Sequence, residues 1–158
     1  MPDHCPKDGG FIGDAGCTHP NHVYSEFAQR LLSQKARRIS PEEADKLLKE
    51  GVYVTSSEGR RVGFGKSLKK HIDDHNYQDA SERRANLLFA IATVKGTLPV
   101  THNERGFEGR TKWVNRTYSD KIILVVSTPD KKAAAEANID IDYVFTIRKE
   151  DKKTRRKK

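Results

Sequence analysis

The sequence predicts the α+β fold class: a small antiparallel sheet with helices packed on one face, preceded by a helical N-terminal region. Helical periodicity dominates the first half of the chain and strand-like runs dominate the second half, an order typical of helices segregated from an antiparallel sheet. The length of 158 residues suits one domain with tails. Apolar residues make up 35% of the chain and charged residues 33%, so we expect the core to exclude both ends.

Two helices are expected before the first strand. Between residues 21 and 38, apolar residues recur with helical spacing on one face. The next helix begins at Ser40, an N-cap residue that is followed by proline and then by Glu43, which completes a capping box. Gly51 ends this helix, because glycine adopts a positive φ at little cost.

A hairpin and two further helices are expected in the middle of the chain. Val52–Val54 and Arg60–Phe64 are short runs with strand character on either side of a turn. Residues 65–76 have the pattern of a short helix. Residues 80–95 have the pattern of a longer helix, which closes at Gly96.

Strands are expected in the last third of the chain. Residues 98–100 contain a proline and therefore suit an edge strand, where a missing backbone donor costs least. Residues 111–118 alternate between apolar and polar, and residues 121–127 form a continuous apolar run typical of a central strand. A short helix or loop over residues 129–138 leads to a final strand at residues 142–148.

Composition divides the chain into four segments. A leader rich in Gly, Pro and His (1–20) precedes a helical region with a short strand (21–59), an α+β domain (60–149) and a basic tail (150–158). Eight Lys or Arg residues and two acidic residues lie between residues 148 and 158, so this end carries six of the eight net positive charges. It is either an electrostatic arm for phosphate groups or a solvated end, and charge alone leaves both interpretations open.

The leader contains residue types that suit zinc: Cys5, Cys17, His19 and His22. Their spacing has no C-x-x-C knuckle, so a leader without metal is the alternative to a structural zinc site. Two cysteines are too few for a disulfide framework. No apolar run reaches the length of a membrane span and the first residues show no secretory pattern, so we expect a cytoplasmic location and no membrane partner.

Two histidines on the expected helix at residues 65–76 are candidates for catalysis. His71 and His75 are four residues apart and share a helix face with Leu68 and Ile72, and this face should border the core. Imidazole titrates near neutral pH, so the pair could supply a general base and a general acid. Half-buried histidines that only pack, and a zinc-binding pair without an evident third ligand, are the alternatives.

The expected strands add cations and hydroxyl groups beside apolar neighbours. Arg116 and Tyr118 share one parity, as do Thr146 and Arg148, and Lys112 lies on the same strand as Arg116. A sheet face with these groups could hold a phosphodiester and stabilise the charge on its oxygens. An ordinary solvent-exposed face is the alternative.

The order of these segments resembles a known nuclease fold. A helix with KKHIDDH is followed by SERRANLLFAIATVKG, LPV, a glycine-containing loop, KWVNRTYSDKIILVVS and a last strand with DYVFTIRK. This order is similar to that of the barnase–EndoU–colicin–RelE-like (BECR) nucleases, and particularly to their phage-associated branch, over about residues 60–149. The resemblance rests on order and residue type rather than on one diagnostic motif.

The resemblance implies a metal-independent endoribonuclease without a catalytic cofactor, which uses the 2′-hydroxyl of RNA as its nucleophile. Such enzymes often serve as toxins or phage effectors, and a cognate inhibitor protein is then expected. His71 or His75 would be the base or the acid. Arg116 would stabilise the phosphate, and Thr146 would donate to a phosphate oxygen or orient a histidine. The residues expected to bind the substrate are Lys112, Tyr118 and Arg148.

Two other functions fit the same sequence. A non-catalytic RNA- or DNA-binding regulator would use the basic tail and bind without turnover. A protein-interaction factor or inhibitor would dock through the helical region at residues 21–50.

Overall fold

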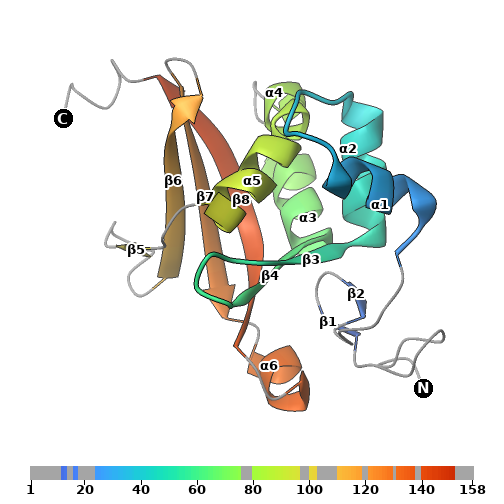
Figure 1. Ribbon diagram of the computed structural model, residues 1–158, viewed down its shortest axis with the longest axis vertical. Coiled ribbons are helices and arrows are strands. Elements are labelled where there is room, and N and C mark those ends of the chain that lie inside the picture. Colours follow the sequence, from blue (N-terminus) through green and yellow to red (C-terminus); the bar gives the residue numbers. More distant parts are fainter. Residues whose placement is uncertain are drawn as a thin grey trace.

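A computed structural model gives the architecture of the chain (Figure 1). The structure describes residues 12–13, 16–17, 24–75, 80–96, 100–102, 110–118, 121–129, 131–137 and 140–151, and for several strand residues it describes the backbone alone. The helices of this part are α1 (Glu26–Ser33), α2 (Pro41–Glu50), α3 (Lys66–His75), α4 (Ala80–Ala85), α5 (Leu87–Gly96) and α6 (Lys131–Ala137). The strands are β1 (Ile12–Gly13), β2 (Gly16–Cys17), β3 (Val52–Thr55), β4 (Arg61–Phe64), β5 (Val100–His102), β6 (Arg110–Tyr118), β7 (Lys121–Pro129) and β8 (Ile141–Asp151).

Six strands form one mixed sheet in the order β3-β4-β8-β7-β6-β5. The α+β class is confirmed, but the sheet is not wholly antiparallel, because β4 and β8 pair in parallel between Arg61–Gly63 and Ile141–Tyr143. A parallel pair needs a long connection, and here four helices (α3 to α6) and three strands (β5 to β7) lie between the two partners in the described part of the chain. The short strands β1 and β2 form a separate antiparallel pair.

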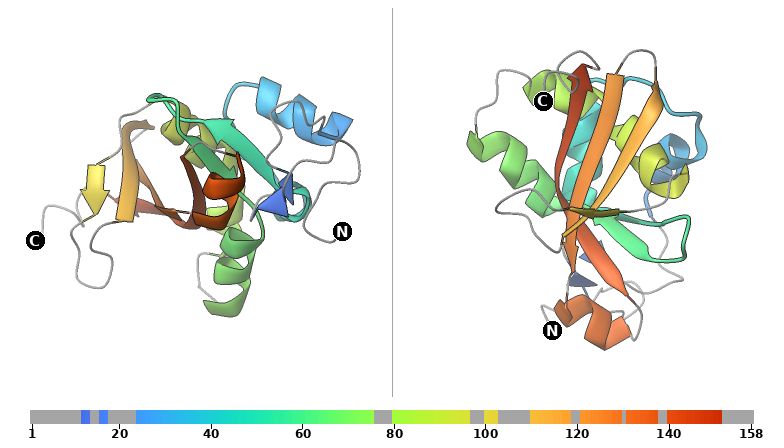
Figure 2. Two further views of the ribbon diagram at one scale, coloured as in Figure 1. Left: turned by 90° about the horizontal axis from the view of Figure 1, so that it is seen from below. Right: turned by 90° about the vertical axis from the view of Figure 1, so that its left-hand side faces the viewer.

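Helices α3 and α5 pack on one face of the sheet, as expected. α3 contacts β8, and α5 contacts β7 and β6 (Figures 1 and 2). Trp113, Val125 and Ile147 are in register on three neighbouring strands, and all three side chains are fully buried. In the right-hand view of Figure 2 these strands face the viewer, and α2 and α5 lie behind them. That row of side chains therefore faces the helices.

One hydrophobic core joins the two segments that composition separates at residue 60. The hairpin of β3 and β4 crosses this position. The core contains Leu47 of α2 and Val52 of β3 together with Leu68 of α3 and Trp113 of β6. The helical region before residue 60 therefore packs against the rest of the chain.

Side-chain caps define the first two helices. Ser25 Oγ accepts from the backbone N–H of Ala28 at 3.2 Å, so α1 starts later than expected and covers only part of residues 21–38. The capping box of α2 is confirmed, because Ser40 and Glu43 each accept from the backbone N–H of the other at 3.1 Å. Gly51 follows α2 with a φ of 76°, a value that favours glycine.

The single helix expected over residues 80–95 is divided into α4 and α5 at Asn86. The backbone N–H of Asn86 is shared between the carbonyl oxygens of Glu82 (3.1 Å) and Arg83 (3.3 Å), as is common at helix ends. α5 is buried on most of its sides and α4 is largely polar. The break lets α5 run through the core while α4 stays at the surface (Figure 1).

Candidate functional site

The candidate site lies where α3 runs along β8 (Figure 1). β4 pairs with β8 only as far as Tyr143, and the chain then turns at Gly65 into α3. Leu68 and Ile72 of α3 are buried, which confirms the inward face that the helical pattern predicted. These two residues determine which side chains of α3 border β8.

His71 lies at the border of this interface. Its side chain is half-buried, and its ring meets the ring of Phe145 edge-on, with centroids 6.1 Å apart and planes at 90°. Edge-to-face packing of this kind favours one orientation of the two rings. One predicted imidazole is therefore held against β8, beside the residue that precedes Thr146. His75 is the last residue of α3, and its side chain lies outside the described part of the structure.

Arg83 on α4 was missed by the sequence interpretation. Its Nη1 donates to Thr146 Oγ1 at 3.3 Å and to the carbonyl oxygen of Ile147 at 2.9 Å. The second contact satisfies a backbone acceptor of β8 beyond the point where β4 stops pairing. Arg83 and Arg84 are neighbours in a charged helix, so no sequence signal identifies the one that reaches β8. We call His71, Arg83, Phe145 and Thr146 the α3–β8 cluster.

Arg84 links helices α2, α3 and α4 beside this cluster through two ion pairs. It donates to Asp45 of α2 at 2.8 Å and contacts Asp73 of α3, which also accepts from Lys69 Nζ at 2.7 Å. The hydrogen bond from Lys69, with the charges of Lys69 and Arg84, holds the pKa of Asp73 below its usual value, although burial opposes this shift. The helix that carries His71 is thus linked to both α2 and α4.

The remaining predicted strand residues are described only as backbone positions: Lys112, Arg116, Tyr118 and Arg148. Lys112 is in register with Val126, and Val126 is in register with Thr146. Asn115, which precedes Arg116, is in register with Ile123, and Ile123 is in register with Lys149. Lys149 lies three residues beyond Thr146 on β8. The register therefore brings Lys112, rather than Arg116, level with Thr146 across β7.

The predicted zinc ligands cannot be placed together. Cys5, His19 and His22 lie outside the described residues, and Cys17 is described only as a backbone position in β2. Among the residues that the structure does describe, no group of three or more His, Cys, Asp or Glu is arranged to hold a metal ion.

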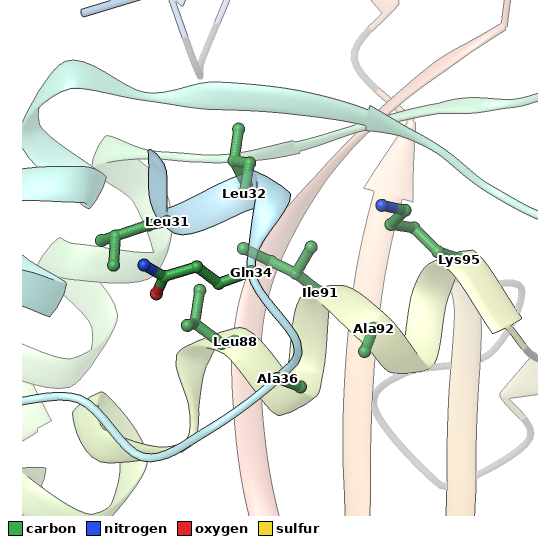
Figure 3. A pocket seen from close by; sticks show the side chains of 8 residues that line it. All are labelled: Leu31, Leu32, Gln34, Ala36, Leu88, Ile91, Ala92 and Lys95. Carbon is green, nitrogen blue, oxygen red and sulfur yellow. The ribbon is translucent and has the colours of Figure 1, made fainter. Parts of the chain in front are cut away.

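An apolar groove lies between α1 and α5 (Figure 3). Its volume is about 40 Å³, and it is lined by Leu31, Leu32, Gln34, Ala36, Leu88, Ile91, Ala92 and Lys95. None of the described residues in this lining is a histidine, a cysteine or a carboxylate, so they offer no group for nucleophilic or general base catalysis at neutral pH.

Comparisons of the chain with protein-family models, with curated proteins and with solved structures found no match. No helix within the described residues is both long enough and apolar enough to cross a membrane.

Proposed function

We propose that this chain is a metal-independent endoribonuclease of the BECR type, with the α3–β8 cluster as its active site. The proposal rests on one observation above all: His71 of α3 packs against Phe145, and Arg83 of α4 binds Thr146 and Ile147, so the two helices contact consecutive residues of β8. An imidazole, a guanidinium and a hydroxyl group are suitable for acid–base catalysis on a phosphodiester and for stabilising its charge.

In the proposed reaction His71 takes the proton of the 2′-hydroxyl, and the resulting oxygen attacks the adjacent phosphorus. The bond from phosphorus to the 5′-oxygen breaks, and His75, one helical turn further on, gives a proton to that oxygen. Arg83 stabilises the charged phosphate, the role first expected of Arg116, and Thr146 donates to a phosphate oxygen. The products are a 2′,3′-cyclic phosphate and a 5′-hydroxyl end. Side chains serve both proton transfers, so the reaction needs no metal ion.

The proposed substrate and partner follow from the same resemblance. RNA is the substrate, and Lys112, Tyr118 and Arg148 would bind it. A toxin or phage effector of this kind would act in the cytoplasm and would be held inactive by a cognate inhibitor protein. The basic end of the chain would raise the rate of encounter with RNA.

A non-catalytic RNA-binding regulator is the second candidate. It is favoured by the contact of Arg83 with the carbonyl oxygen of Ile147, since a cation that only closes a strand edge would make the same contact. On this hypothesis the α3–β8 cluster is structural and the basic tail carries the binding.

The test is cleavage of total RNA by the purified full chain in excess EDTA. Cleavage should persist in EDTA and fall by about 10²–10⁴-fold in His71→Ala, the usual contribution of a general acid or base. Lys70→Ala is the matched control, because Lys70 is the exposed neighbour of His71 on α3 and should leave the rate nearly unchanged. Both variants should retain the circular dichroism spectrum of the wild type.

The two candidates give opposite results in this experiment. RNA that is bound but left intact at every protein concentration would reject the nuclease and select the regulator. Equal cleavage by His71→Ala and the wild type would reject the α3–β8 cluster as the active site.

A further inference from the structure

At the other end of β8, α6 connects β7 to β8 (Figure 1). A cavity lies beside this connection. The cavity has a volume of about 330 Å³, and it is lined by Arg60, Pro129, Lys131, Ala134, Asp140, Ile141 and Asp142. This volume lies at the lower end of the range of small-molecule sites. Lys131 and Asp140 are exposed, so the cavity opens to solvent beside them.

A buried carboxylate borders this cavity. The side chain of Asp142 is only 4% exposed. Its Oδ2 accepts from Ser127 Oγ at 2.7 Å and from Arg60 Nη1 at 3.3 Å, and Ser127 is itself fully buried. Burying a charge is costly, and the cost is normally offset by ion pairs and hydrogen bonds to the charged group. These contacts stabilise Oδ2, but they do not explain why the carboxylate borders a cavity.

The charges around the cavity restrict the ligand. Among the described residues of the lining, two cations, Arg60 and Lys131, are matched by two carboxylates, Asp140 and Asp142. These balanced charges give no net attraction for a polyanion such as RNA, so this cavity does not suit the substrate proposed above. A small ligand with one positive and one negative group has charges that complement both kinds of side chain.

The positions of these charged side chains also determine how the ligand is oriented in the cavity. The guanidinium of Arg60 already contacts Asp142 at 3.3 Å and Glu58 at 3.4 Å, so Lys131 is the better partner for a negative group of the ligand. An ammonium group of the ligand would lie between Asp140 and Asp142. Apolar side chains complete the lining: Pro129, Ala134 and Ile141.

We propose that this cavity binds a free α-amino acid with an apolar side chain. Its ammonium group contacts Asp140 and Asp142, its carboxylate contacts Lys131, and its side chain lies against Ile141. Binding there would set the position of α6 without taking part in RNA cleavage.

Isothermal titration calorimetry on the full chain tests this site with three matched probes. L-leucine carries both charged groups, 3-methylbutan-1-amine lacks the carboxylate, and 4-methylpentanoate lacks the ammonium group. L-leucine should bind, and each analogue should bind at least about tenfold more weakly, because it loses one charge-assisted contact. Equal binding of the amine and of L-leucine would overturn the assignment to an amino acid.

Two substitutions on α6 locate the site. Ala134→Phe places a ring in the cavity and should abolish L-leucine binding. Ala135→Phe, at the exposed neighbouring position, is the control and should bind as the wild type does. Lack of binding by the wild type at about 10 mM L-leucine, a concentration that detects even millimolar dissociation constants, would overturn the proposal. So would equal binding by the two variants. Neither result bears on RNA cleavage, which is measured without amino acids.

Discussion

Replacing Asp142 by alanine should destabilise the fold measurably, because this carboxylate links β7 and β8 to the residue that precedes β4. Ser127 lies on β7, Asp142 lies on β8, and Arg60 immediately precedes β4. Both partners contact Oδ2 of Asp142. The substitution removes the acceptor and leaves the hydroxyl of Ser127 buried.

The two contacts contribute unequally. A hydrogen bond from a buried hydroxyl to a charged acceptor contributes about 1.5–3 kcal/mol. The side chain of Arg60 is 28% exposed and keeps Glu58 as a partner, so its ion pair with Asp142 adds at most about 1 kcal/mol. We therefore expect Asp142→Ala to lower the free energy of unfolding by about 2–4 kcal/mol. Ser127→Ala should cost less, because it removes one contact and leaves the ion pair.

Urea unfolding followed by tryptophan fluorescence measures this loss. Trp113 is the single tryptophan of the chain and is fully buried, so its emission reports loss of the core. With a slope of about 2 kcal/mol per molar urea, the midpoint should fall by about 1–2 M. Asp140→Ala is the control, since this exposed neighbour should change stability by less than about 0.5 kcal/mol. Equal midpoints for Asp142→Ala and Asp140→Ala would refute the reasoning.

Four further predictions test other parts of the structure. Ser40→Ala should lower the free energy of unfolding by about 1 kcal/mol through loss of the helix cap, and an unchanged urea midpoint would contradict the capping box. Asp73→Asn should weaken the dependence of stability on acid pH. The pKa of Asp73 is lowered in the folded state, so its contribution to stability is fully present above the ordinary pKa of 3.8. That contribution is lost as the pH falls through the lowered pKa of the folded state. Urea midpoints at about pH 7 and pH 3 should therefore differ less in the variant than in the wild type, and an equal difference would contradict the ion-pair assignment. Arg83→Lys keeps the charge but not the planar fork, so it should reduce RNA cleavage at least about tenfold, and a wild-type rate would remove Arg83 from the mechanism. Removal of residues 152–158, which carry six Lys or Arg, should lower RNA affinity and flatten its salt dependence, and unchanged binding at low salt would exclude the tail as an electrostatic arm.

Features set by local sequence could be predicted. The capping box of Ser40 and Glu43 and the inward stripe of Leu68 and Ile72 depend on spacing within one helix. The break at Asn86 could not be predicted, because the residues on both sides of it suit a helix and only the packing of α5 in the core separates them.

Features that depend on contacts between distant parts of the chain could not be predicted from the sequence. The parallel pairing of β4 with β8 joins segments about eighty positions apart, and no local pattern in either strand specifies it. Arg83 and Arg84 are distinguished only by their contacts in the folded chain, where Arg83 binds β8 and Arg84 binds α2. Asp142 has the sequence appearance of an ordinary strand start, and its role appears only once Ser127 lies beside it.

The central claim is that the chain cleaves RNA through its 2′-hydroxyl groups, and a matched pair of oligonucleotides tests it most directly. An RNA and the all-deoxy strand of the same sequence are incubated with the full chain in EDTA, and the product ends are identified by mass spectrometry. Only the RNA should be cut, and its fragments should end in 2′,3′-cyclic phosphates. Cleavage of both strands, or of neither, would contradict the central claim.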